Sequence, residues 1–179
     1  MKKLLLSSIV LTFCFFGAKA QMAQGDFHFG AGLNLGLPTG DFKTTNSFGI
    51  GGHLQAEYNF TENVTGVATT GYTAFLGKTF TFDDGLGNTE SVKAPTYGLI
   101  PIVVGARFYP VEQFFIGAQA GLGILTGGGS STSAFDYYPQ IGYNADNFQV
   151  IFGYNGLSKN GETLSNLSLT GIFKFGGGK

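Results

Sequence analysis

The chain has 179 residues, of which 43% are hydrophobic, 15% aromatic and 12% charged, and its formal net charge is −1. Binding to nucleic acid would require an excess of basic side chains, so this balance excludes nucleic acid as an expected partner. The single cysteine, Cys14, lies near the N-terminus, and without it the chain holds no disulfide, thiol catalyst or cysteine-based metal site.

Residues 1–20 predict a secretory signal peptide. Lys2 and Lys3 precede an apolar run of 13 residues, and Ala18-Lys19-Ala20 provides a small-residue cleavage site. The run is shorter than the roughly 20 residues that a spanning helix needs, which disfavours a retained membrane helix. Phe13 stands where a lipid-anchored Cys14 would need a small residue. Cleavage leaves residues 21–179 as one domain, with seven basic and eleven acidic side chains.

Residues 27–37 introduce the pattern that organises the domain. Every odd residue from Phe27 to Leu37 is apolar, and every even residue is glycine or polar. Alternation over eleven residues predicts a β-strand about long enough to cross a bilayer at a tilt. Seven further segments of similar length follow, at residues 48–60, 64–76, 97–109, 114–125, 134–143, 148–155 and 164–175.

The connections between these segments are predicted to alternate in length. Residues 38–47, 77–96, 127–133 and 158–163 form the longer ones, and residues 61–63, 110–112 and 144–146 form the short turns. In the longest, residues 79–82 and 89–93 can form a protruding hairpin. Asp83 and Asp84 near its tip could bind Ca²⁺, but a plain turn is the favoured interpretation. This alternation predicts periplasmic termini and long extracellular loops.

These features predict an all-β fold, an eight-stranded antiparallel up-and-down transmembrane β-barrel. Only helices and closed barrels satisfy their backbone groups within lipid, and no segment after Ala20 has the length and apolar character of a membrane helix. Aromatic residues gather at the short-turn ends, where an interfacial girdle is expected: Tyr58, Phe60, Phe108, Phe114, Tyr143, Phe148, Phe173 and Phe175.

Inward-facing charges predict a polar plug in the periplasmic half of the lumen. The inward set is His28, His53, Glu57, Arg107, Asp136 and Lys174. Of these, His28, Glu57, Arg107 and Lys174 lie near the periplasmic ends of their strands. A buried carboxylate needs a cationic partner, so a structural network around Glu57 and Arg107 is favoured over a proton or ion gate.

The outer half of the lumen carries small inward residues, Gly36, Gly49, Gly51 and Gly123, beside the apolar Phe75. In the favoured interpretation the glycines make room for Phe75, Tyr97 and Tyr138. The alternative is an outward-opening pocket for an acyl chain, since eight strands leave room for one small ligand at most.

Catalysis is not expected. A serine hydrolase needs a histidine beside a serine at the outer rim, whereas both His28 and His53 are predicted to face the lumen. The sequence contains no phosphate loop, zinc-ligand spacing or nucleotide fingerprint. We therefore predict no catalytic residue, no metal site and no cofactor.

The mature chain resembles the small outer-membrane β-barrel family common in Bacteroidetes, which is similar to eight-stranded OmpA/OmpX-type barrels. The resemblance rests on the whole mature chain and on stretches such as residues 99–109, 117–123 and 138–143. It implies a Gram-negative outer membrane, contact with its lipid, and insertion by the barrel-assembly machinery. Phe175 looks like the terminal aromatic assembly signal of such barrels, although four residues, Gly176 to Lys179, follow it.

A non-catalytic surface barrel is the function that these features favour. It would serve envelope structure or contact an extracellular partner through residues 77–96, whose hairpin offers an exposed strand edge. The alternative is a narrow porin-like channel or a barrel that binds a small apolar ligand. A lipid-modifying enzyme is the least favoured interpretation.

Overall fold

The computed structural model describes residues 24–83 and 89–176. The signal peptide predicted for residues 1–20 lies outside these ranges, as do Asp84 and residues 177–179 of the C-terminal tail.

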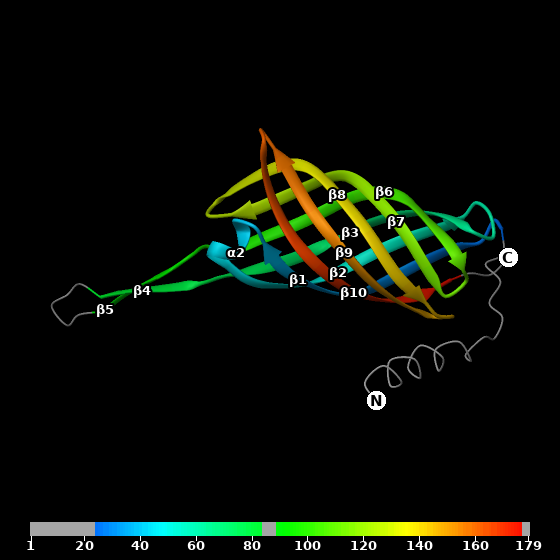
Figure 1. Ribbon diagram of the computed structural model, residues 1–179, viewed down its shortest axis with the longest axis horizontal. Helices are drawn as coiled ribbons and strands as arrows, with labels where there is room; N and C mark the ends of the chain where they lie inside the picture. The colour runs from blue at the N-terminus through cyan, green and yellow to red at the C-terminus, as the bar shows by residue number, and fades with distance from the viewer. Residues whose placement is uncertain (1–23, 84–88, 177–179) are drawn as a thin grey trace, which may run out of the picture.

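Eight long strands close into one antiparallel barrel in the order β1-β10-β9-β8-β7-β6-β3-β2, as Figure 1 shows. This confirms the predicted fold class. The barrel strands are β1 (Phe27–Thr39), β2 (Asn46–Asn59), β3 (Val64–Gly77), β6 (Tyr97–Val111), β7 (Phe114–Gly127), β8 (Ser130–Asn144), β9 (Phe148–Lys159) and β10 (Glu162–Phe175). A single helical turn, α2 (Phe42–Thr45), connects β1 to β2. Within residues 24–83 and 89–176, no helix has the length and apolar character needed to cross a membrane.

The outer surface of the barrel is apolar because alternate residues of each strand point away from the lumen. Leu33 is 70% exposed and Val104 is 64% exposed, and all eight barrel strands contribute large exposed apolar side chains. An apolar surface of this extent would drive aggregation in water, whereas it matches the apolar band by which a membrane barrel contacts lipid.

The two ends of the barrel differ in their outward-facing residues. At the end with the turns after β2, β6 and β8, the apolar surface continues to a set of exposed aromatic side chains that includes Tyr58, Phe108 and Phe114. At the opposite end, the outward positions of β7 to β10 carry hydroxyl side chains, namely Thr126, Ser131, Ser133, Ser158 and Thr163. The strands therefore extend past the apolar band at one end only.

Two of the connections predicted to be long are tight turns. Strands β7 and β8 remain paired as far as Gly127 and Ser130, and β9 and β10 as far as Lys159 and Glu162. The turn residues Gly128, Gly129, Asn160 and Gly161 have φ angles of 58°, 82°, 53° and 88°. Positive φ at both central residues suits a two-residue hairpin turn. The predicted loops at residues 127–133 and 158–163 are therefore wrong, because the ladders continue through polar residues that show no apolar alternation.

The predicted loop at residues 38–47 is also shorter than expected. Pro38 and Thr39 belong to β1, and Asn46 and Ser47 belong to β2, so the connection shrinks to residues 40–45 and contains α2. Long and short connections consequently do not alternate around the barrel, and orientation has to be argued from other features.

The connection from β3 to β6 carries a separate two-stranded sheet, formed by β4 (Thr79–Asp83) and β5 (Thr89–Lys93). We call this sheet the hairpin. It projects from the mouth of the barrel along the long axis of the molecule (Figure 1), and every residue of its two strands is exposed. The hairpin predicted at residues 79–82 and 89–93 is thus confirmed, with Asp83 added to its first strand.

Candidate functional site

The lumen at the short-turn end is organised around Arg107 of β6, which is 1% exposed. Its Nη1 donates to Oε1 of Glu57, with which it forms an ion pair, and to Oε1 of Gln149 at 3.1 Å. Its Nη2 donates to Oε1 of Gln55 at 2.7 Å and to Oε1 of Gln140 at 3.0 Å. One guanidinium therefore links β2, β6, β8 and β9 across the lumen.

Amide groups complete the surroundings of this ion pair. Nε2 of Gln149 lies 3.0 and 3.1 Å from the two carboxylate oxygens of Glu57, and Nε2 of Gln55 donates to Oε1 of Gln149 at 2.9 Å. Cζ of Arg107 lies 4.4 Å from the centre of the Phe115 ring, a cation–π arrangement. A buried ion pair is tolerated when hydrogen bonds satisfy its remaining donors and acceptors, and these contacts fulfil much of that condition.

The other two residues expected in this network lie at its edge. Nζ of Lys174 donates to Oδ1 of Asn144 at 2.7 Å, and Nε2 of Gln149 donates to the same oxygen at 3.0 Å. His28 pairs with Glu57 in the ladder between β1 and β2, but its Nδ1 lies 3.1 Å from the carbonyl oxygen of Gly176 in an exposed position. Among the described hydrogen bonds and ion pairs, neither side chain contacts Glu57 or Arg107 directly.

Sequence reasoning missed these glutamines, although a signal was present. Gln55, Gln140 and Gln149 all occupy inward positions of alternating segments, on strands that surround Arg107. A guanidinium carries five donors, so one carboxylate cannot satisfy it and further acceptors had to be sought.

The glycines of the predicted outer pocket face side chains or backbone that fill the space. A Cβ atom placed on Gly36 or Gly49 would lie 2.7 or 2.6 Å from Cε1 of Phe75. One on Gly51 would lie 2.6 Å from Cα of Thr73, and one on Gly123 would meet the side chain of Leu157. This arrangement corresponds to the interpretation in which the glycines make room for neighbouring groups.

The mouth of the barrel is closed by Phe42 of α2, which is 3% exposed. Its ring lies 5.0 Å from that of Phe75 and 6.3 Å from that of Tyr97, centre to centre, in edge-on geometry. Leu99 and Leu157 belong to the same buried cluster. Sequence reasoning assigned Phe42 to a loop, and the signal that could have identified it was a large aromatic residue in an otherwise polar connection.

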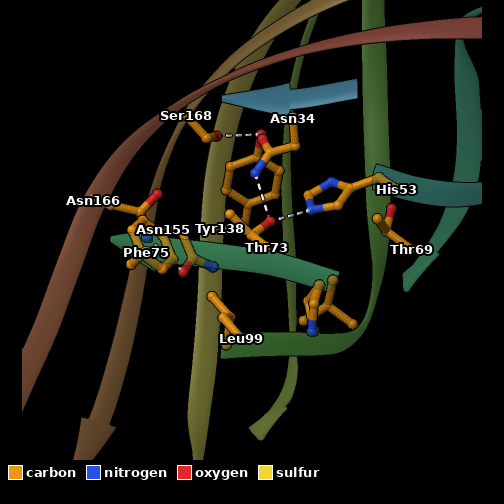
Figure 2. A pocket seen from close by; sticks show the side chains of 12 residues that line it. Asn34, His53, Thr69, Thr73, Phe75, Leu99, Tyr138, Asn155, Asn166 and Ser168 are labelled. Carbon is orange, nitrogen blue, oxygen red and sulfur yellow. Dashed lines mark hydrogen bonds between the residues drawn. The ribbon is translucent and has the colours of Figure 1, made fainter. Parts of the chain in front are cut away.

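A small cavity remains in the lumen, lined by Phe75 and Leu99 of the mouth cluster and by His53 and Tyr138 (Figure 2). Its volume is about 20 Å³. Its wall includes a chain of hydrogen bonds in which Nδ2 of Asn34 donates to Oγ1 of Thr73 at 2.9 Å, and Oγ1 of Thr73 lies 3.4 Å from Nε2 of His53. Phe75 lines the cavity, whereas the four glycines of the predicted pocket do not. The space suits about one water molecule and cannot hold an acyl chain.

Asp136 is buried in the outer half without forming a metal site. Its Oδ1 accepts a hydrogen bond of 2.5 Å from Nδ2 of Asn155, and Oδ1 of Asn155 accepts one of 3.2 Å from Nδ2 of Asn166. In the part of the chain that the structure describes, no group of three or more His, Cys, Asp or Glu residues could hold a metal ion.

Solved structures with a similar fold are small outer-membrane barrels. Ail, the attachment invasion locus protein of Yersinia pestis, superimposes with a TM-score of 0.57 at 15% identity, over 86% of this chain and 100% of Ail. The N-terminal barrel domain of Pseudomonas aeruginosa OprF gives a TM-score of 0.52 at 14% identity, over 85% of this chain and 98% of the domain. The chain has the fold of the small outer-membrane β-barrels.

Further comparisons agree with this fold without naming a role. Neisserial surface protein A gives a TM-score of 0.53 at 14% identity, over 84% of this chain and 96% of that protein. Ail has also been solved in a phospholipid bilayer nanodisc and with the heparin analogue sucrose octasulfate. No protein-family model matches the chain, and no curated protein matches it either.

Replacing Arg107 by Met should destabilise the barrel by about 3–5 kcal/mol, because Glu57 then remains buried without its cation. The double variant Glu57→Met with Arg107→Met should lose less than the single variant. The free energy of unfolding follows from urea titrations of the refolded protein, read from its heat-modifiable gel mobility. Lys43→Met, in the exposed part of α2, serves as the control and should cost clearly less. Additive losses from the two lumen substitutions would show that Glu57 and Arg107 do not act as a pair.

Steric filling by Phe75 should be visible in a second pair of variants. Gly49→Ala places a Cβ against the Phe75 ring and should cost about 1–3 kcal/mol by overpacking. In a Phe75→Leu background the same substitution should cost less, since the smaller side chain leaves space. Ala31→Gly, at an outward-facing position of β1, serves as the control. An undiminished cost in the Phe75→Leu background would contradict the proposed filling.

Proposed function

We propose that the protein is a non-catalytic integral barrel of a Gram-negative outer membrane, which contacts a partner through the extracellular hairpin. The observation that carries this proposal is the contrast between the sealed lumen and the fully exposed hairpin. Side chains fill both halves of the lumen, whereas Phe80, Phe82 and Val92 project from the hairpin at 38%, 59% and 56% exposure.

The proposed orientation places both termini in the periplasm and the hairpin outside the cell. Barrels of this kind carry short periplasmic turns and longer extracellular extensions. Here the hairpin, α2 and the hydroxyl-bearing strand ends all lie at one end of the barrel. Phe27 and Phe175 lie at the other end, where the aromatic side chains gather. A cleavable signal peptide at residues 1–20 and recognition of Phe175 by the barrel-assembly machinery belong to the same proposal.

Filling of the lumen supports a structural barrel over a channel or a ligand carrier. An eight-stranded barrel has an interior just wide enough for its own side chains. The Arg107 network crosses it at one level and the Phe42–Phe75 cluster closes it at another. The cavity lined by Phe75, Leu99 and Tyr138 is too small for an acyl chain, which favours the structural role.

The hairpin supports a role in binding a partner because it combines two properties of elements that bind peptides. In the described residues β4 and β5 pair only with each other, which leaves the outer edge of each strand available for a further strand. Its exposed apolar side chains add a surface that gains free energy on burial. No barrel strand shares a sheet with it.

The refolded protein should give no steady single-channel conductance in a planar lipid bilayer, because the Arg107 network and the buried cluster of Phe42, Phe75, Leu99 and Leu157 occupy the lumen at two levels. The measurement is a current recording at several voltages, with heat-denatured protein as the blank. Phe42→Ala is a useful comparison, since it opens the mouth and leaves the Arg107 network in place, and it should stay silent as well. A stable conductance step from the unmodified protein would replace the structural role with a channel.

Trypsin added to intact cells should cut the hairpin at Lys93, which is exposed and lies outside the apolar band. The fragments can be sized by mass spectrometry of purified outer membranes. An affinity tag inserted after Glu112, in the turn between β6 and β7, should resist labelling on intact cells and react after permeabilisation. Labelling of that tag on intact cells would reverse the proposed orientation.

A further inference from the structure

The two faces of the hairpin differ in chemistry because of the pairing register. Phe80 pairs with Val92, and Phe82 pairs with Glu90. Residues that pair across an antiparallel ribbon, and those two positions along, lie on the same face. We call the face with Phe80, Phe82, Glu90 and Val92 the apolar face. The opposite face, which we call the polar face, carries Thr79 with Lys93, Thr81 with Ser91, and Asp83 with Thr89.

The apolar face carries one charged residue of β4 and β5, Glu90. Glu90 is exposed and belongs to no ion pair among the described residues. The side chain of Lys93 lies on the polar face, and Nζ of Lys78, just before β4, donates to the carbonyl oxygen of Lys43 at 2.5 Å. The two cations at the base of the hairpin therefore do not pair with Glu90, and a negative charge stands unpaired among exposed apolar side chains.

The geometry of a β-ribbon decides which kind of segment fits on this face. The N–H and C=O groups of its strands lie in the plane of the ribbon, so the face itself offers only side chains. An extended segment laid across the face would press its own unpaired backbone groups against apolar side chains, which costs free energy. An α-helix pairs these groups internally and can present an apolar stripe. The face therefore suits a helix, whereas the edges of the ribbon suit a strand.

The size of the face favours a short peptide over a folded protein. Five residues of a strand extend over about 17 Å, which is the length of about eleven residues, or three turns, of helix. Two such strands bury less than the roughly 1,000 Å² expected of a stable interface between folded proteins. The hairpin also projects away from the barrel (Figure 1), so the barrel does not extend the face. A short helix can use the whole of it.

We propose that the apolar face of the hairpin binds a free cationic amphipathic peptide as a short helix. The apolar stripe of the peptide covers Phe80, Phe82 and Val92, and a lysine or arginine beside the stripe pairs with Glu90. The proposal rests on the extracellular hairpin of the proposed function and names its partner. Burial of the apolar side chains supplies affinity, and Glu90 supplies the preference for positive charge.

The test uses the full-length protein in nanodiscs of phosphatidylcholine, a zwitterionic lipid that limits adsorption of cationic peptides to the bilayer. The probe is a fluorescently labelled peptide of about 14 residues, with leucine at i, i+3, i+4 and i+7 and lysine elsewhere. We expect saturable binding by fluorescence anisotropy and a gain of helix in the difference circular dichroism spectrum. Protein in which a Gly-Ser linker replaces the hairpin provides the baseline.

Two control peptides separate shape from charge. The first has the same leucine and lysine content in strict alternation, which is the pattern of a strand. The second keeps the helical pattern and replaces each lysine by glutamate. Each should bind about tenfold more weakly than the probe or worse, because the first places no helical stripe on the face and the second repels Glu90.

Variants of the hairpin test the residues. Glu90→Lys should weaken binding of the lysine peptide by about tenfold and should improve binding of the glutamate peptide. Asp83→Lys is the matched control, since it makes the same change of charge on the polar face, and its effect should stay below about threefold because of screening. Phe82→Ser with Val92→Ser should abolish binding. Heat-modifiable gel mobility verifies that each barrel is folded.

The proposal is overturned if binding does not exceed the baseline, if the glutamate peptide binds as well as the probe, or if Glu90→Lys and Asp83→Lys have equal effects. Unchanged binding by the serine variant would also overturn it. Tighter binding of the alternating peptide would make a strand at the ribbon edge the partner, which contradicts the helix and leaves a binding role of the hairpin intact. Trypsin cleavage at Lys93 on intact cells and the absence of conductance report separately on the proposed function.

Discussion

Closure of the sheet between β1 and β10 is the constraint on which the rest of the structure depends. The two strands pair from Phe29 with Phe175 to Thr39 with Ser165, so the barrel has no open edge in the apolar band. Backbone groups in lipid have no water partner, which makes this closure obligatory. Eight strands also set a lumen only as wide as side chains are long. Arg107 can therefore reach acceptors on three other strands, and Phe75 can fill the space beside Gly36 and Gly49.

A lumen filled in this way moves the available chemistry to the outside of the barrel. Both terminal nitrogens of Arg107 donate to neighbouring side chains, and Phe42 covers the mouth. The hairpin differs because it has two strands, no covering layer and three exposed large apolar side chains. Burying that surface against a partner would gain free energy that the barrel itself cannot supply.

Much of the fold followed from period-2 alternation, which identified most of the barrel strands and the face that their residues occupy. The pattern failed where alternation of polarity ends while strand pairing continues, as at Ser130–Ser133 and Ser158–Thr163. Hydroxyl side chains on both faces carry no periodic signal, but their backbone groups pair as well as any others. The network of the lumen was predicted only in part. Glu57 and Arg107 lie together, whereas Lys174 joins them only through Asn144 and Gln149, and the ring of His28 turns to Gly176.

The sequence by itself determined strand number, the inward or outward direction of side chains, and the presence of a protruding hairpin, since these depend on local periodicity and turn chemistry. Tertiary structure alone decided which inward residues meet, because that depends on the stagger between strands and on how far each side chain reaches across the lumen. It placed Gln55, Gln140 and Gln149 around Arg107, and Phe75 in the space that Gly36 and Gly49 leave open. It also brought Phe42 over the mouth, since contacts across a closed barrel join residues that are distant in the chain.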